Sequence, residues 1–366
     1  MRSARPVRSP LNDHRRILKV NRTIRIAAAT AAGVGCLAGA SSAFATATGS
    51  GATFPAVAYQ NWCGTFKSCS YTGVGSSAGI RALTAKTVDF AGSDATLTDA
   101  QLAAIGGRVS YFPTLLGAIT VPVNIAGVTG NKLKLSGKEV ADIFQGTITT
   151  WNNPVLVKSN PVLKNATGTI TLCVRSDGSG TSWNFSRYLT KMSPAFATAI
   201  SFSQTPNWPA SAIKSAGNPG VANCVKSNAN SVGYVDLADA IRAGLQTNVT
   251  AIGKSELVKQ GGKTKRKLVY VLPSAKSIEA AGSIKVSQIK PDLTIDFTGS
   301  SNAGAYPITI TTWVLAVPGR AKNGEVKGVL GQFYSPEAQG ALVGLGFAPL
   351  PKNVLNVAKV AASKLG

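Results

Sequence analysis

The segment most informative about the architecture of the chain is ITLCVRSDGSGTS, which spans residues 170–182. Its first five residues are mostly apolar and three of them are β-branched, which predicts a strand over 170–174. A turn rich in glycine and hydroxyl side chains follows, and the apolar residues beyond it recur at the period of a helix. We expect a strand–turn–helix unit here, with the inner face of the helix formed by Trp183, Tyr188, Leu189 and Met192.

Two further segments repeat this arrangement. Residues 49–55, GSGATFP, open a helix-period segment, and residues 71–79, YTGVGSSAG, open another at Ile80. Strand–turn–helix units repeated along a chain predict an α/β fold with parallel strands. In such folds ligands bind at the carboxyl ends of the strands, where loops meet helix N-termini. The three turns are therefore the candidate ligand-binding segments.

The three turns share one chemistry, because each combines hydroxyl side chains with backbone N–H groups at the start of a helix. Unpaired N–H groups and the positive end of the helix dipole favour an anion. One such turn indicates no more than helix capping, but three of them together with Arg175 favour an oxyanion ligand. A fourth segment, VDFAGSDA at 88–95, predicts a short strand followed by a loop with Asp94, for which capping of a turn is the simpler alternative.

The composition is that of a folded protein preceded by an export signal. The chain has 366 residues, 44% hydrophobic and 14% charged, which excludes a disordered basic tail and suggests about two domains. Residues 1–25 are basic, residues 26–40 are apolar, and a small-residue motif ends at Ala45. This pattern predicts a signal peptide over 1–45 with cleavage after Ala45, since the apolar run is shorter than the ~20 residues that span a bilayer.

Three alternatives for this leader stay open. Translation can begin later, near Val20; the arginine pair at 15–16 can belong to a twin-arginine signal; and Cys36 can carry a lipid. Ordinary cleavage is favoured over lipidation because Gly33, and not a Leu-like residue, stands three places before Cys36. The product is expected in the periplasm or at the cell-envelope surface.

Removing the leader changes both the charge and the histidine content. The whole chain carries 38 Lys+Arg and 15 Asp+Glu, of which the leader holds eight and one, so the remainder has 38 − 8 = 30 and 15 − 1 = 14, a net charge of +16. The single histidine, His14, also belongs to the leader. Four cysteines remain, and we expect the disulfides Cys63–Cys69, by proximity, and Cys173–Cys224, by elimination, with buried free thiols as the alternative. Without histidine they form no convincing zinc site, and no metal or other cofactor is expected.

Enzyme motifs fail on missing residues. GSSAG at 75–79 fits the G-x-S-x-G nucleophile motif of α/β-hydrolases, but that mechanism requires a histidine, and none follows His14. Gly253 begins a Gly-Lys-Ser triplet typical of a P-loop, but Asn248 stands where the first glycine of that loop is required. The acidic residues are scattered, which argues against metal-assisted phosphoester hydrolysis. We therefore expect a binding protein and not an enzyme.

The densest charge run is KTKRK at 263–267, and it is expected to form the turn between two strands, 255–258 and 268–272. A solvated hairpin tip is the simplest interpretation. Nucleic-acid binding requires aromatic residues among the basic ones. The run has none, so no nucleic-acid partner is expected.

The turns also match a known family. The chain resembles the phosphate-binding proteins of bacterial ABC phosphate importers over essentially its whole length after the leader. The most specific matching segment is RSDGSGTS at 175–182. The other matching segments are 49–56, 71–77, 87–95, 112–114, 123–125, 142–146, 150–151, 231–235, 306–309 and 346–351.

The resemblance implies an α/β fold of two lobes, the periplasmic-binding-protein-like type II fold, with a hinge and a central ligand cleft. Lobe one would comprise 46–121 plus 307–366, and lobe two 122–306, with crossings near Val121 and Pro307. Carried over by position, the phosphate-binding residues would be Thr53, the backbone of Phe54, Ser76, Asp94, Arg175, Ser179, Gly180 and Thr181. Asp177 would orient Arg175, and Ser77 would lie just behind the residues that touch the ligand.

The implied function is high-affinity extracytoplasmic binding of inorganic phosphate, as HPO4 or H2PO4, by a monomer that delivers it to the membrane subunits of an ABC permease. Two alternatives are a secreted phosphoester hydrolase on the same fold and a binder of another tetrahedral oxyanion. The chain departs from the family at Ala78, where glycine is frequent, in its two expected disulfides and in the basic residues of 259–267. These departures leave the site residues intact, although Cys224 would constrain lobe two.

Asp94 is the informative residue, because a carboxylate repels an anion unless the ligand donates a hydrogen bond to it. Protonated phosphate can donate, and fully ionised sulfate cannot. Hydroxyls, N–H groups and a forked guanidinium can satisfy the remaining ligand oxygens. We therefore predict selectivity for phosphate over sulfate.

Overall fold

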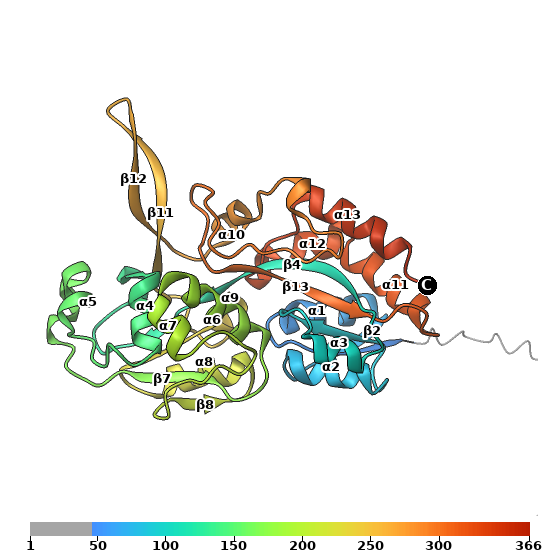
Figure 1. Ribbon diagram of the computed structural model, residues 1–366, viewed down its shortest axis with the longest axis horizontal. Helices are drawn as coiled ribbons and strands as arrows, with labels where there is room; N and C mark the ends of the chain where they lie inside the picture. Colours follow the sequence, from blue (N-terminus) through green and yellow to red (C-terminus); the bar gives the residue numbers. More distant parts are fainter. Residues whose placement is uncertain (1–45) are drawn as a thin grey trace, which may run out of the picture. The chain divides into compact units, whose positions relative to one another are not determined.

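A computed structural model of the chain describes residues 46–366 (Figure 1). The leader expected over 1–45, with its cleavage point after Ala45 and with Cys36, lies outside the described residues. Within the described part, no helix combines the length and apolar character that a membrane crossing requires. Three sheets and the helices around them build this part of the chain.

The largest sheet has six strands in the order β10-β4-β13-β3-β1-β2. Their bounds are β1 Ala47–Gly51, β2 Cys69–Gly73, β3 Phe90–Ser93, β4 Ser110–Thr120, β10 Val235–Asp236 and β13 Thr309–Ala316. β1 lies between β2 and β3 and runs parallel to both, whereas β13 is antiparallel to β3 and β4. The parallel strands confirm two of the expected units, because β1 leads into α1 (Ala56–Phe66) and β2 into α2 (Ser76–Thr84).

The second sheet has four strands in the order β5-β9-β7-β8. Their bounds are β5 Val123–Asn124, β7 Thr171–Arg175, β8 Ile213–Ser215 and β9 Ser231–Gly233. β7 confirms the strand expected over 170–174, runs parallel to β8 and β9, and leads into α6 (Gly180–Met192). Each of the two larger sheets therefore contains three neighbouring parallel strands.

Helix α6 corrects part of its expected inner face. Tyr188 and Leu189 are buried as predicted, but Trp183 and Met192 are only partly buried. The Arg187 guanidinium lies 4.9 Å from the centre of the Trp183 ring. At roughly 100° per residue, Trp183 stands about 140° from Tyr188 around the helix, so an apolar residue there reaches the edge of the buried face and not its centre.

The third sheet corrects a second expectation. Its order is β12-β11-β6, with β6 Lys134–Ser136, β11 Ala251–Gln260 and β12 Lys263–Val271. Gly261 and Gly262 both have positive φ and form the whole turn between β11 and β12. The basic residues 263–267 therefore belong to a strand and not to the turn, because a two-residue glycine turn leaves Lys263 already paired with β11.

Helices cover the faces of the sheets. Besides α1, α2 and α6, they are α3 Asp99–Ala104, α4 Gly137–Phe144, α5 Pro154–Ser159, α7 Pro194–Ala199, α8 Gly217–Ser227, α9 Leu237–Arg242, α10 Ala275–Gly282, α11 Asn323–Phe333, α12 Pro336–Ala341 and α13 Lys352–Ser363. Buried aromatic rings hold them in place: Tyr59 and Trp62 of α1 pack on Phe333 of α11. Phe185 of α6 stacks on Tyr234, directly after β9, at 4.5 Å. Full burial of such a side chain contributes about 1.5–3 kcal/mol of transfer free energy.

Both expected disulfides are present. Cys63 of α1 bonds to Cys69 of β2, and Cys173 of β7 bonds to Cys224 of α8. The second joins residues 51 positions apart. A cross-link of that span stabilises the fold by about 4 kcal/mol in the chain-entropy picture.

The chain between β12 and β13 packs on the largest sheet, and Figure 1 shows α10 beside β4. A Cβ at Gly282 of α10 would lie 2.5 Å from Leu116 Cδ1 of β4. The indole N–H of Trp313 on β13 donates to the Leu293 carbonyl at 3.1 Å. The lobe boundary expected near Pro307 stays a prediction, and these contacts favour an earlier return of the chain to lobe one, just after β12.

Candidate functional site

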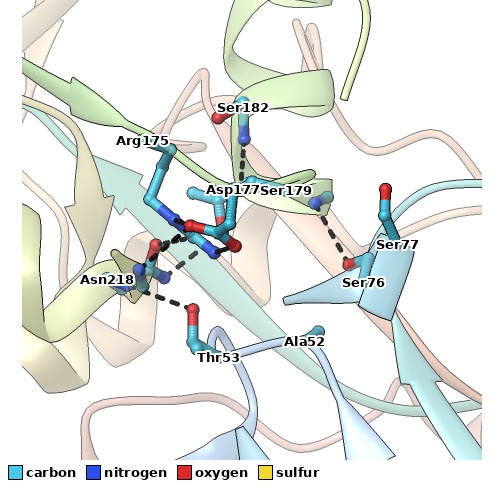
Figure 2. Close-up of polar contacts among 12 residues, drawn as sticks. Ala52, Thr53, Ser76, Ser77, Arg175, Asp177, Ser179, Ser182 and Asn218 are labelled. Carbon is cyan, nitrogen blue, oxygen red and sulfur yellow. Dashed lines mark hydrogen bonds and ion pairs between the residues drawn. The ribbon is translucent and has the colours of Figure 1, made fainter. Parts of the chain in front are cut away.

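The carboxyl ends of the parallel strands in the two larger sheets meet at a buried cluster of polar residues. Thr53 follows β1, Ser76 follows β2 and Asp94 follows β3, while α6 and α8 follow β7 and β8 in the second sheet. The Gly180 N–H at the start of α6 donates to Ser76 Oγ at 3.1 Å. The Asn218 N–H at the start of α8 donates to Thr53 Oγ1 at 3.1 Å. Figure 2 shows both of these contacts between the sheets.

Arg175 is the cation of this cluster and is only 5% exposed. Its Nε and Nη2 donate to the two carboxylate oxygens of Asp177 at 2.8 and 2.5 Å, and its Nη1 donates to Asn218 Oδ1 at 2.5 Å (Figure 2). A guanidinium has five N–H groups. Three of these N–H groups donate to Asp177 and Asn218, so two N–H groups remain for a ligand. The same contacts fix the orientation of the guanidinium.

Two carboxylates of the cluster, Asp177 and Asp94, differ in environment. Burial acts to raise the pKa of Asp177, but the hydrogen bonds and charge of Arg175 hold that pKa below its usual value. Asp94 is 1% exposed, and its Oδ1 accepts a hydrogen bond from the Thr312 hydroxyl at 2.7 Å. Burial raises the pKa of Asp94 to about 7, against the opposing effects of the Thr312 hydrogen bond and the Arg175 charge. Near neutral pH, Asp94 can therefore exist both as an acceptor and as a donor.

Four hydroxyl side chains of the cluster are at most 6% exposed: Thr53, Ser76, Ser179 and Thr181. Ser179 Oγ caps α6 by accepting from the Ser182 N–H at 3.0 Å, and Thr181 Oγ1 accepts from Asn218 Nδ2 at 3.2 Å. A hydroxyl that accepts one hydrogen bond still has its own proton to donate. The cluster is therefore rich in donors.

Phe54 presents its backbone to the cluster and its side chain to the core. The ring is fully buried and meets the Phe347 ring edge-on at 6.0 Å. Within residues 46–366, the Phe54 N–H makes no hydrogen bond. It precedes α1, and α1, α2, α6 and α8 all begin near the cluster, so their dipoles add positive potential there.

Glycine allows the loops of the two sheets to come this close. A Cβ at Gly180 would lie 2.6 Å from Ser76 Oγ and 2.7 Å from Asp94 Cβ. A Cβ at Gly75, whose φ is +92°, would lie 2.2 Å from Asp177 Oδ2. The loops therefore meet with no room for one more methyl group at either position.

Ser77 is half-buried and joins the two sets of loops. Its N–H donates to the Gly178 carbonyl at 3.0 Å, and its hydroxyl donates to the amide oxygen of Gln204. An amide oxygen is too weak a base to take the serine proton. The G-x-S-x-G match at 75–79 therefore has a structural role here.

Three residues of the cluster escape prediction from sequence: Asn218, Asp236 and Thr312. Asn218 lies in SAGNPG at 215–220, a fourth small-residue turn that follows a strand and opens a helix. That turn could have indicated a fourth ligand-binding segment. The strand before it, β8, is only three residues long and contains a lysine, so its apolar pattern is too short to predict a strand. Thr312 lies 218 residues from Asp94, and no local pattern links the two.

Asp236 extends the network behind Asn218. Asp236 is fully buried, and its Oδ2 accepts from Asn218 Nδ2 at 2.7 Å. Its Oδ1 accepts from the Asp239 N–H at 2.9 Å and thereby caps α9. Burial, followed by the nearby Asp239 charge, raises the pKa of Asp236. The side chain of Asn218 thus donates to Asp236 and accepts from Arg175, so Asp236 fixes the orientation of the amide that positions Arg175.

Comparison with known proteins leads to one family. A family model described as the PBP superfamily domain matches residues 27–337. The phosphate-binding protein PstS of Xylella fastidiosa is 31% identical over 316 residues, which cover 84% of this chain and 82% of that protein. The chain belongs to the PstS family. A PstS protein of Haemophilus influenzae is 32% identical and covers 85% of this chain and 91% of its own length.

A solved structure supports the same architecture. A high affinity periplasmic phosphate-binding protein, bound with phosphate, superposes with a TM-score of 0.66 and covers 86% of this chain and 93% of its own. At 23% identity this likeness concerns the fold alone. It confirms the expected two-lobe type II fold for this PstS-family chain.

Proposed function

We propose that this PstS-family chain binds inorganic phosphate at the cluster between the two larger sheets and delivers it to an ABC-type phosphate import permease. The observation that carries the proposal is the make-up of the cluster, in which donors that follow strands of both sheets and the Arg175 guanidinium lie near the buried carboxylate of Asp94. The relatives are named for the same ligand. Near neutral pH, phosphate carries one proton, so it offers several acceptor oxygens and one donor, which matches this make-up.

In this proposal each residue has a stated role. The donors are Thr53, the N–H of Phe54, Ser76, Arg175, Ser179, Gly180 and Thr181, and Asp94 accepts the hydrogen bond that the phosphate proton donates. Asp177 and Asn218 orient Arg175. Because phosphate contacts residues from both sheets at once, it favours the closed arrangement of the lobes. We further propose that the exported chain acts as a monomer after cleavage behind Ala45.

Calorimetric titration of the exported protein with phosphate and, separately, with sulfate tests this function. We expect phosphate to bind at least about tenfold more tightly at pH 8, because sulfate must either leave the buried Asp94 carboxylate without a donor or bind the roughly one tenth of the protein in which Asp94 is protonated. Comparable affinities for the two anions would contradict the assignment and favour a general oxyanion binder.

The same preparation tests the hydrolase alternative. The relatives are named as binding proteins, and the Ser77 hydroxyl faces an amide oxygen in place of a base. We expect no turnover of a chromogenic phosphoester. Turnover by the wild type that disappears in Ser77→Ala would establish the alternative.

Asn218→Ala is expected to weaken phosphate binding about 10- to 100-fold. The change removes the acceptor of Arg175 Nη1 and leaves the buried Asp236 without its amide partner, and an unpaired buried polar group costs about 1–3 kcal/mol. Calorimetry measures the loss. Asn228→Ala is the matched control, because Asn228 caps the opposite end of α8 through the Cys224 carbonyl. Equal phosphate affinities of the two variants would show that Asn218 does not position Arg175.

A further inference from the structure

Beyond its base, the β11–β12 hairpin is a ribbon of two strands. β6 pairs with β11 only over Ala251, Ile252 and Gly253, and farther out β11 and β12 pair with each other. Figure 1 shows this outer part extending away from the neighbouring elements. A two-stranded ribbon gains little stability on its own in water. Its length therefore suggests a contact with something outside the chain.

The base of the hairpin is anchored to the rest of the protein. Lys254 and Glu256 form an ion pair at 3.2 Å, and their side chains are only 7% and 11% exposed. Lys254 also donates to the Asn302 carbonyl, and the Gly304 N–H donates to Glu256 Oε1 at 2.9 Å. Glu256 is the only acidic residue between 251 and 271. The hairpin thus projects from a fixed base, and its one carboxylate is already paired there.

The outer part of the hairpin carries a concentrated positive charge. Its exposed cations are Lys259, Lys263, Lys265, Arg266 and Lys267, and no acidic residue lies between 257 and 268. Alternation along β12 places Lys263, Lys265 and Lys267 on one face of the ribbon and Arg266 on the other. Like charges at this spacing repel one another. An anionic partner would remove that repulsion.

Two exposed leucines accompany these cations. Leu257 is 68% exposed and Leu268 is 48% exposed. In the hairpin register Leu257 lies opposite Arg266, and Leu268 lies opposite Ser255, which places both leucines on the Arg266 face. Lys259, opposite Thr264, shares this face. Leucines beside the long cationic side chains of Lys259 and Arg266 suit the interface of a bilayer, where apolar groups enter and the cations reach the headgroups.

We propose that the outer part of this hairpin, residues 257–268, binds the surface of an anionic phospholipid bilayer. Each Lys or Arg close to such a surface strengthens binding about fivefold, and the leucines add apolar burial. A soluble polyanion would use the cations but would gain nothing from the leucines, which is why the bilayer is the better fit. This contact involves none of the residues proposed to bind phosphate. It would concentrate the protein at the membrane that holds the proposed permease.

Vesicle co-sedimentation of the exported protein tests this inference. Vesicles of mixed phosphatidylglycerol and phosphatidylcholine are compared with phosphatidylcholine alone, at low and high salt. We expect binding only to the mixed vesicles, weakened by salt. The variant K259Q/R266Q, which removes the two cations on the leucine face, should bind about 25-fold more weakly. The control K352Q/K359Q removes the same charge from exposed lysines of α13 and should bind like the wild type.

The leucines separate a bilayer from a soluble polyanion. L257S/L268S should lose about tenfold in binding to the mixed vesicles and should keep its affinity for soluble polyphosphate. Unchanged vesicle binding by L257S/L268S, or equal loss in K259Q/R266Q and K352Q/K359Q, would overturn the proposal. A phosphate titration of every variant reports the proposed ligand function separately, and it should match the wild type because these residues are exposed and remote from Arg175.

Discussion

Replacing Asp94 with asparagine is expected to reduce the preference for phosphate over sulfate about tenfold at pH 8, the factor to which a pKa of about 7 limits the rejection of sulfate by the ionised carboxylate. The carboxylate of Asp94 is 1% exposed and can only accept a hydrogen bond when ionised, so sulfate leaves it unpaired. The asparagine amide can donate to sulfate and carries no repelling charge. Calorimetric titration of both proteins with both anions at pH 8 measures the change. Asp99→Asn, on the exposed first turn of α3, removes the same charge and should keep the wild-type preference.

The raised pKa of Asp94 adds a dependence on pH to this result. With a pKa of about 7, the protonated fraction rises from about a tenth at pH 8 to nearly all at about pH 5. A protonated carboxyl can donate to sulfate, so wild-type affinity for sulfate should rise about tenfold over this range. Asp94→Asn should show no such rise. A flat sulfate affinity in the wild type would exclude Asp94 as the discriminating group.

Gly180→Ala is expected to weaken phosphate binding about 1000-fold while the fold persists. The new Cβ would lie 2.6–2.8 Å from atoms of Ser76 and Asp94, which follow strands β2 and β3 of the other large sheet. Overpacking costs up to about 3 kcal/mol, and displacement of the Gly180 N–H, a proposed phosphate donor, costs about 1 kcal/mol more. The clash therefore opposes closure of the two lobes and leaves each sheet intact.

The measurement for Gly180→Ala is a phosphate titration beside a thermal melt. Gly331→Ala serves as the control, because a Cβ at this helical glycine of α11 would meet no atom within 4 Å. A normal melting midpoint with lost phosphate binding is the expected pair of results. Wild-type phosphate affinity in Gly180→Ala would show that binding does not need the Gly180–Ser76 approach.

Local rules predict the parts of the site that local sequence builds. The turns after β1, β2 and β7 are visible because a strand pattern, glycines with hydroxyls and a helix period follow in order, and all three form. The same rules fail at Asn218, where the preceding strand is too short to show alternation, and at Thr312, whose partner Asp94 is distant in sequence. Contacts between sheets depend on the tertiary arrangement, which no local pattern encodes.

The charge run of the β11–β12 hairpin does not by itself predict the local conformation. A run of cations such as 263–267 indicates exposure to solvent, and exposure is compatible with a turn or with an uncovered strand. The conformation is set by Gly261 and Gly262, whose positive φ forms the two-residue turn. The glycine pair is the conformational signal, and the charge run indicates only which residues face water.

The Cys173–Cys224 bond links two elements of the ligand site covalently, and this link can form only under oxidising conditions. Cys173 stands two residues before Arg175 on β7, and Cys224 belongs to α8, the helix that begins beside Asn218. The bond therefore ties the strand of the guanidinium to the helix of its amide partner. In a reducing compartment only noncovalent contacts join this strand and helix. We therefore expect the strand of Arg175 and the helix of Asn218 to be joined covalently only after the chain reaches an oxidising compartment.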